Sequence, residues 1–475
     1  MRFDEYVEFD ATGLAALVRG GEVTADELLD AALERAAVTD SAIAAVVHVQ
    51  EPAARAAIAA GLPDGPFAGV PFLLKDLGCE AIDFPTSMGS RLFDGYRYSY
   101  DSEMFVRMRD TGVVTFGRTT SPELGIGVTT EAAVYGRPTR NPWNTEHVAG
   151  GSSGGSGSAV AAGVVPLAHG SDGGGSVRIP ASSCGLFGLK PTRALLPDGP
   201  ESGEGWAGMA IDGLLARSVR DTAAMLDATA GPDLGAPYYA PPRIGSFLDA
   251  IAAPPRRLRV AVTTRTFTGE AIHPDCVAAV EHTAKLLESL GHEVVPAEPT
   301  LDMHGLIVAW SEIVACGTQR TVDAAGPGAE ERVERVTRLA CELGRTLSGA
   351  HYLGCIDTVH AVGRQLARFL VPFDVLLTAT LGEPPALLGR FASGRPDGWR
   401  SFLEYRLEHV LPYSPYAPLA NCTGQPAMSL PLWWNDAGLP VGTQIMGRAG
   451  EDDVLLQLAA QLEDAHPWFH RRPSP

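Results

Sequence analysis

The chain has 475 residues, of which 45% are hydrophobic and 20% are charged, a composition typical of a folded globular protein. Its 56 acidic and 37 basic residues give a net charge of −19, which argues against nucleic acid or an anionic membrane as the main partner, because both bind basic surfaces. No secretory signal is visible after Met1 and the apolar runs are too short to span a bilayer, so a cytoplasmic location is expected.

The first sixty residues are expected to be helical. Thr24 and Glu27 have the spacing of a capping box, which predicts a helix over residues 25–37, and a second helix is expected over residues 53–60. The pattern then changes to short apolar runs bounded by glycine or charge. Two of these runs, at residues 69–74 and 113–116, predict buried strands.

The middle of the chain alternates between strand and helix patterns. Small apolar residues at 158–163 suit a helix packed closely under a sheet, and residues 258–263, 275–290 and 293–295 read as strand, helix and strand. Such alternation predicts an α/β structure with a largely buried sheet. Because no linker or repeat is visible, a single domain over residues 1–475 is expected.

Two segments interrupt this regularity. Residues 197–213 are rich in glycine and proline and are expected to form a loop, while the prolines of residues 237–255 predict a surface crossing. Amphipathic helices are expected over residues 337–347 and 358–370.

Cysteine and histidine positions give little support to a metal site. The seven cysteines are scattered without a Cys-x-x-Cys pair, so we expect mostly buried thiols in a reducing compartment and no disulfide framework. His466 and His470 have helical spacing, but Pro467 between them disfavours a continuous helix that presents both. No metal site is therefore predicted.

Two serines lie in glycine-dense turns. Ser152 lies within residues 150–156, and Ser176 directly follows Gly173, Gly174 and Gly175. Glycine lets backbone amides crowd one point in space without steric cost. The amides of residues 173–176 can therefore hold the negative charge that develops on a carbonyl oxygen under attack by Ser176.

A lysine upstream supplies a candidate base for these serines. Lys75 ends the apolar run that starts at Val70, and desolvation disfavours the charged ammonium form. Asp76 beside it would oppose this effect if it pointed toward the amine. The combination predicts a serine nucleophile whose base is a lysine and not a histidine.

Other interpretations of the same residues stay open at this point. The turn before Ser176 is also compatible with a simple tight turn and helix cap. Gly150, Ser152 and Gly154 match the nucleophile elbow of α/β-hydrolases, which would make Ser152 the nucleophile of an esterase with a later Asp and His. A phosphate-binding module is disfavoured, because no Walker lysine follows the glycines.

Together these motifs resemble the amidase signature family, in which Lys75, Ser152 and Ser176 occupy the positions of the lysine, the cis-serine and the nucleophilic serine. The spacing of the two serines agrees with that family as well. The resemblance is carried by residues 69–76, 140–143, 150–155, 174–181, 188–192, 423–427 and 438–442.

The resemblance implies a fold, a mechanism and a set of site residues. The fold would be a single large mixed, mostly parallel sheet flanked by helices. Neutral Lys75 would take the proton of Ser176 through Ser152, and water would later hydrolyse the acyl-enzyme, without metal or cofactor. Three further residues would support the site by hydrogen bonds and charge, namely Ser153, Asp172 and Arg178.

The resemblance also bears on the substrate. The motifs at residues 65–71, 175–182 and 216–221 are most similar to those of hydrolases of the cyclic dimer of 6-aminohexanoate, which suggests a small apolar linear or cyclic amide. Aryl acylamides and carbamates are competitors, and a glutaminase-type subunit of a tRNA-dependent amidotransferase is the alternative within the family. Whether the chain is a monomer or a homodimer is left open.

Some positions depart from the family pattern. Gly173 stands where the family has an aliphatic residue, which is expected to loosen the oxyanion loop. Residues 194–212 match poorly, although this segment shapes the acyl pocket in the family. Residues 300–410 form the variable substrate-entrance region, where Trp310 and Cys316 are candidates for pocket walls but core packing is the preferred interpretation.

Overall fold

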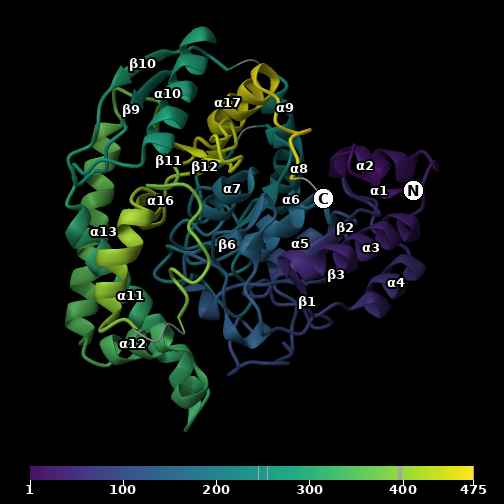
Figure 1. Cartoon of the computed structure of the whole chain (residues 1–475), viewed down its shortest axis with the longest axis horizontal. Helices are drawn as coiled ribbons and strands as arrows, with labels where there is room; N and C mark the ends of the chain where they lie inside the picture. The colour runs from purple at the N-terminus through teal and green to yellow at the C-terminus, as the bar shows by residue number, and fades with distance from the viewer. Residues whose placement is uncertain (244, 254, 394–397, 474–475) are drawn as a thin grey trace.

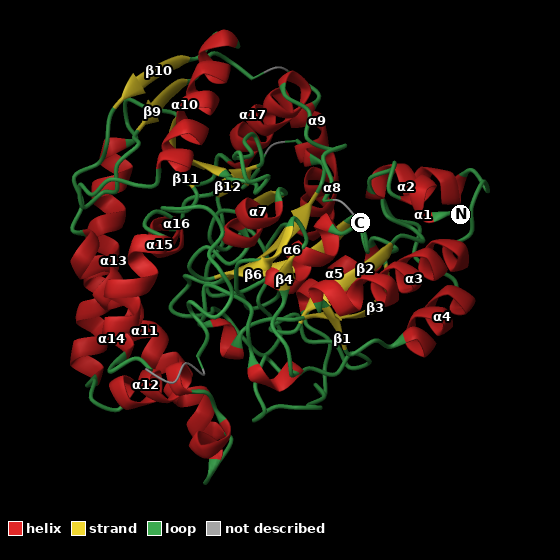
Figure 2. Ribbon diagram, viewed as in Figure 1, coloured by secondary structure: helices red, strands yellow, loops and turns green. Residues whose placement is uncertain are grey.

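A large mixed sheet lies at the centre of the molecule. The computed structural model describes residues 1–243, 245–253, 255–393 and 398–473. The sheet has eight strands in the order β10-β9-β11-β13-β12-β7-β8-β6, with helices around it (Figure 2). The strands are β6 (Leu167–Asp172), β7 (Phe187–Lys190), β8 (Ile211–Ala216), β9 (Arg259–Val262), β10 (Glu293–Pro296), β11 (Val375–Ala379), β12 (Ala427–Leu430) and β13 (Thr443–Gly447).

The mixed sheet flanked by helices confirms the expected fold class, but the proportion of parallel pairs is smaller than expected. β9 pairs in parallel with β10 and β11, as the predicted strand–helix–strand unit requires. The other neighbouring pairs, from β11 through β6, are antiparallel. No helix lies between β12 and β13 or between β7 and β8 in the described chain, whereas neighbouring parallel strands are usually joined by a crossover helix.

A second, smaller sheet carries the predicted lysine. It has the order β1-β3-β2, with β2 (Pro71–Lys75) parallel to β3 (Val114–Thr119) and β1 (Val46–Val47) antiparallel to β3. The expectation of one sheet is therefore incomplete. The backbone amide of Lys75 donates to His169 Nδ1 of β6 at 3.2 Å, which ties the two sheets together. A further pair consists of β4 (Arg140–Asn141) and β5 (Asn144–Val148).

Helices lie to the left of the sheets, to their right and above them in the view of Figure 1. In the N-terminal part the capping box of Thr24 and Glu27 is present, and its helix continues six residues beyond the predicted end, to Ile43. The helices up to residue 300 are α1 (Phe3–Tyr6), α2 (Ala11–Arg19), α3 (Ala25–Ile43), α4 (Glu51–Ala60), α5 (Glu103–Asp110), α6 (Gly154–Ala161), α7 (Arg178–Cys184), α8 (Val219–Thr229), α9 (Phe247–Ile251) and α10 (Pro274–Ser289).

The predicted loops contain short regular elements. β8 begins at Ile211 inside the segment 197–213, and α9 lies inside the segment 237–255, of which residues 244 and 254 lie outside the described part of the chain. The predicted helices at 337–347 and 358–370 are present with shifted ends. The helices after residue 300 are α11 (Met303–Ala324), α12 (Arg335–Gly344), α13 (Gly349–Phe369), α14 (Phe402–Glu404), the π-helix η4 (Tyr405–Val410), α15 (Leu411–Tyr413), α16 (Ala417–Thr423) and α17 (Asp452–Ala465).

Three helices of the entrance region form a layer on one side of the sheet. α11, α12 and α13 lie together at the left of Figure 1, and their inner faces share one apolar core with β11. Residues 394–397 of this region lie outside the described residues. No helix of the described chain is long and apolar enough to cross a membrane. All seven cysteines are free thiols and six are buried, as expected.

Candidate active site

Lys75 ends strand β2, whose five residues are all buried. Its Nζ lies 2.7 Å from Ser152 Oγ, 2.9 Å from Ser171 Oγ and 3.4 Å from the carbonyl oxygen of Ser171. The structure therefore brings the predicted residues Lys75 and Ser152 into contact. Ser171 is a contact that the sequence analysis missed, although it directly precedes the predicted supporting residue Asp172.

Burial lowers the pKa of Lys75 to about 7, although the negative charges of Asp172 and Asp212 oppose the shift. Asp76 does not oppose it by direct contact, because its carboxylate points elsewhere. It accepts hydrogen bonds from Thr86, Ser87 and Tyr135. The neutral form of the amine is thus accessible near pH 7.

The turn that carries Ser152 is anchored by its neighbour Ser153. The peptide bond between Gly151 and Ser152 is cis. Ser153 Oγ donates to the carbonyl oxygen of Ser171 at 3.2 Å, and the backbone amide of Ser153 donates to the carbonyl oxygen of Ser176 at 3.1 Å. Ser153 therefore links the loops of both serines.

A buried ion pair anchors the glycine turn. Asp172 and Arg178 are both fully buried, and Arg178 donates to the carboxylate through Nε at 3.0 Å and through Nη2 at 2.9 Å. Asn421 Nδ2 adds a donor at 2.9 Å. Burial alone would raise the pKa of Asp172, but the charge and hydrogen bonds of Arg178 outweigh it and hold the pKa well below its usual range.

The amides of the glycine turn are not equivalent. The amide of Gly175 donates to Asp172 Oδ1 at 2.7 Å, so it is engaged inside the protein. Within the described chain, the amides of Gly174 and Ser176 have no acceptor. The structure thus removes Gly175 from the predicted set of free donors.

Two tryptophans pack against this turn. A Cβ atom on Gly173 would meet the ring of Trp206 at 2.5 Å, and one on Gly174 would meet Trp310 at 2.5 Å. Trp310 Nε1 also donates to the carbonyl oxygen of Gly173 at 3.1 Å. The expectation that Gly173 leaves a gap in the packing is therefore wrong. Trp206 fills the space of the missing side chain, and it comes from the segment 194–212, which matches the family poorly.

Ser176 lies at the surface of a cavity. Its side chain is mostly buried, and the helix that follows, α7, starts at Arg178 with Val177 at its cap. Ser176 is thus not the helix cap of the simple-turn interpretation. Ser152 and Ser176 both line a cavity of about 400 Å³. Its apolar walls are formed by Leu77, Met88, Tyr98, Leu124, Trp206 and Ile211, and Glu80, Asp198 and Asp212 add carboxylates.

A smaller cavity that Ser176 also lines contains a residue that the sequence analysis missed. Arg406 of η4 is 3% exposed and lines this cavity together with Gly174, Ser176 and Trp310. The guanidinium packs over the rings of Trp310 and two other aromatic residues, and within the described chain it has no hydrogen-bond or ion-pair partner. The hydroxyl of Ser414 in the same cavity is also unpaired.

Comparison with known proteins agrees with this geometry. The model of the Amidase family matches residues 27–456. The 6-aminohexanoate-cyclic-dimer hydrolase of Paenarthrobacter ureafaciens is 39% identical, over 98% of this chain and 96% of its own length. The chain belongs to the amidase family. Like its relatives, this amidase is a hydrolase that acts on the C–N bonds of small-molecule amides.

Solved structures of relatives show the same fold as this amidase. A structure of 6-aminohexanoate cyclic dimer hydrolase superposes with a TM-score of 0.93 at 37% identity and covers 98% of this chain and 99% of that one. A bacterial aryl acylamidase of the amidase signature family superposes with a TM-score of 0.85 at 25% identity, over 97% and 96% of the two chains. The esterase alternative is disfavoured, because Ser152 Oγ meets Lys75 and not a histidine.

We expect Arg178→Met to lower the free energy of unfolding by about 3–5 kcal/mol, because it leaves the buried Asp172 carboxylate without its counter-charge. The deficit should shrink at acid pH, where protonation of Asp172 removes the unpaired charge. Urea denaturation followed by circular dichroism measures both effects. The control is Arg109→Met, which removes a half-exposed ion pair with Asp101 and should cost less than about 1 kcal/mol. Equal losses in the two variants would contradict this assignment.

Proposed function

We propose that this amidase cleaves its substrate through an acyl-enzyme on Ser176, with Lys75 as base and Ser152 as relay. The observation that carries the proposal is the 2.7 Å contact between buried Lys75 Nζ and Ser152 Oγ, at the wall of the cavity that also contains Ser176. A neutral amine has two N–H groups and one lone pair. The two oxygens of Ser171 accept the N–H groups, which leaves the lone pair to accept the Ser152 proton.

Protons pass between Ser176, Ser152 and Lys75 in both directions during the reaction. Ser176 Oγ gives its proton to Ser152 as it attacks the carbonyl carbon, and Ser152 passes its own proton to Lys75. The proton returns to the amine as it leaves, and water is activated by the same residues to release the acid. The Ser176 hydroxyl has no partner among the described residues, so its hydrogen bond to Ser152 forms when the substrate docks.

The glycine turn holds the developing oxyanion. We assign this role to the amides of Gly173, Gly174 and Ser176, while the amide of Gly175 fixes the turn through Asp172. Ser153, Asp172 and Arg178 act as supporting residues, because they join the turn to the Ser152 loop and to the sheet. No metal or cofactor enters any of these steps.

The substrate that fits the two cavities is an apolar linear or cyclic amide with a second carbonyl group. The apolar walls of the larger cavity suit methylene or aryl groups. Arg406 and Ser414 offer unpaired donors near Ser176 that suit a second carbonyl oxygen. The 6-aminohexanoate cyclic dimer appears in the name of a relative and contains two amide carbonyl groups. It is therefore the first compound to test.

A substrate panel tests this proposal. We expect faster amine release from oligomers of caprolactam or from anilides than ammonia release from free glutamine. The panel should also include carbamates and primary amides, with amine release read directly. Faster turnover of glutamine than of every hydrophobic amide would refute the proposed substrate class and favour the glutaminase alternative.

Arg406→Met should lower kcat/KM by about 10–150-fold for a substrate with a second carbonyl, because a hydrogen bond to a charged group contributes about 1.5–3 kcal/mol. Turnover of a simple alkanoyl anilide, which lacks that carbonyl, should change little. Arg364→Met on the exposed face of α13 is the matched control and should leave both substrates unaffected. An equal loss on both substrates would show that Arg406 only maintains the fold.

We also propose a cytoplasmic enzyme that acts without nucleic acid or membrane partners. The seven free thiols support a reducing compartment. The choice between a monomer and a homodimer is open, and sedimentation of the purified chain tests it directly. A stable monomer at micromolar concentration would contradict the dimer.

A further inference from the structure

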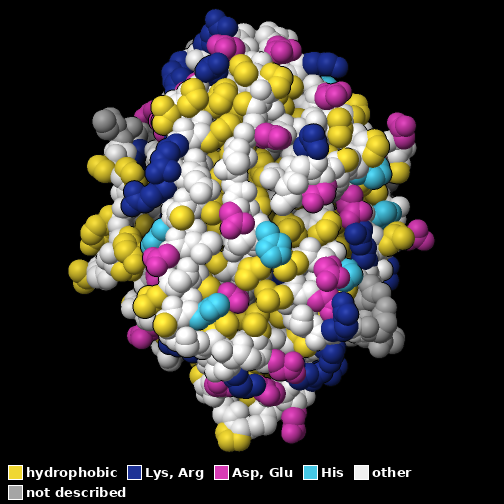
Figure 3. All heavy atoms as spheres, turned by 90° about the vertical axis from the view of Figure 1, so that its left-hand side faces the viewer, with side chains coloured by type: hydrophobic (Ala, Val, Ile, Leu, Met, Phe, Trp, Pro, Cys, Tyr) yellow, Lys and Arg dark blue, Asp and Glu magenta, His cyan; other side chains and the backbone are white. Residues whose placement is uncertain are grey.

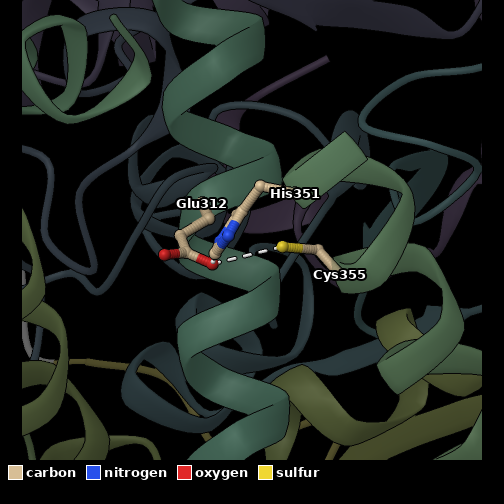
Figure 4. Close-up of side chains that lie close together, drawn as sticks. All are labelled: Glu312, His351 and Cys355. Atoms are coloured by element: carbon tan, nitrogen blue, oxygen red, sulfur yellow. Dashed lines mark hydrogen bonds and ion pairs between the residues drawn. The ribbon is translucent and has the colours of Figure 1, made fainter. Parts of the chain in front are cut away.

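A cluster of metal-type ligands lies between two helices of the entrance region. Figure 4 shows Glu312 of α11 facing His351 and Cys355 of α13. Glu312 Oε2 lies 2.8 Å from His351 Nε2 and 3.1 Å from Cys355 Sγ, and the three ligand atoms lie within 4.8 Å of one another. None of these residues takes part in the proposed reaction.

The spacing along α13 places two of the ligands on the same face of that helix. His351 and Cys355 are four positions apart, so both side chains face α11. Carboxylate, imidazole and thiolate are the ligands of protein zinc sites.

The burial of the cluster is uneven in a way that suits ion uptake. Glu312 and Cys355 are buried, whereas about half of the His351 side chain is exposed to solvent. The face of the molecule that carries α13 shows histidines among hydrophobic and acidic side chains (Figure 3). An ion can therefore reach the cluster from solvent through His351 without opening the core.

We propose that Glu312, His351 and Cys355 bind one Zn²⁺ ion per chain, with a water molecule as the fourth ligand. In a tetrahedral site the oxygen would lie about 3.4 Å from the nitrogen and about 3.6 Å from the sulfur, given the usual bond lengths to zinc. The observed separations of 2.8 and 3.1 Å need to open by only about half an ångström. The hydrogen bonds among the three side chains thus preform the site.

Binding involves the loss of a proton. The thiol proton of Cys355 passes to the buffer as sulfur bonds to zinc, and the imidazole of His351 binds in its neutral form. Zinc affinity should therefore increase as the pH rises.

Occupancy would fix α11 against α13 on one side of the active site. α11 also carries Trp310, whose Nε1 donates to the carbonyl oxygen of Gly173 in the glycine turn. The ion would act as a structural clamp that positions this helix, and it would take no part in amide hydrolysis.

Cobalt substitution tests the proposal independently of activity. The full chain, reduced and freed of metal, is titrated with Co²⁺, and we expect a thiolate-to-cobalt charge-transfer band that saturates at one ion per chain. Zn²⁺ should displace the cobalt and raise the unfolding temperature. Cys355→Ser should abolish the charge-transfer band, and His351→Ala should weaken Zn²⁺ binding more than about 100-fold, since even loss of an outer-shell partner costs 10–100-fold.

Two variants serve as matched controls. Cys341→Ala removes a buried thiol outside the cluster, and His360→Ala removes an exposed histidine of α13. Both should bind cobalt like the unmodified chain, and circular dichroism confirms that every variant is folded. Absence of the charge-transfer band in the unmodified chain, or its persistence in folded Cys355→Ser, would overturn the proposal.

Discussion

Replacing Ser176 with alanine is expected to lower amide turnover by roughly 10⁴–10⁶-fold and to abolish covalent labelling by a serine-directed fluorophosphonate. The reason is that, in the proposed mechanism, Ser176 forms the bond to the acyl carbon, and alanine has no hydroxyl group with which to form it. Release of amine and mass spectrometry of the labelled chain measure the two effects.

Ser152→Ala separates this mechanism from the elbow alternative. A relay group contributes about 10²–10⁴-fold, so this variant should still be labelled at Ser176, but slowly. An elbow enzyme would show the reverse pattern, with full labelling after loss of Ser176 and none after loss of Ser152. That reversed pattern would refute the assignment of both serines.

Lys75→Ala should lose nearly all amide hydrolysis and keep some hydrolysis of esters, whose leaving group needs no protonation. Lys75→Arg should be equally inactive, because a guanidinium does not deprotonate in the accessible pH range. In the unmodified enzyme kcat/KM should rise about tenfold per pH unit below the pKa of about 7 and level off above it, since only the neutral amine accepts the proton. Near-normal amide turnover by Lys75→Ala would overturn the lysine mechanism.

Stability gives a second readout for Lys75. Its pKa is lower in the folded chain than the unfolded value of 10.5, so the unfolded chain binds more protons between pH 7 and pH 10.5. The cost of burying this amine is therefore fully present below pH 7 and disappears above pH 10.5. Lys75→Met should be more stable than the unmodified chain at pH 6 and equally stable near pH 11, even though it is inactive. Equal stability at both values would show that the amine is not desolvated.

The sequence by itself was enough to predict the reaction class, hydrolysis of an amide C–N bond. Lys75, Ser152 and Ser176 were predicted as site residues because a lysine in an apolar strand and serines in glycine turns are local patterns with a direct chemical meaning. The unit β9–α10–β10 was predicted for the same reason, because the spacing of apolar residues and the residues that end each element are local features of the sequence. The single domain over residues 1–475 stays a prediction.

Only the tertiary structure decided how these parts meet. Asn421 reaches Asp172 across 249 positions of sequence, Trp206 fills the space beside Gly173, and Arg406 lines a cavity together with Ser176. The same holds for the cluster of Glu312 and His351, whose helices are separated in the sequence by α12. Local pattern cannot predict such pairs, because the energy that selects them comes from burial and long-range packing and not from neighbouring residues.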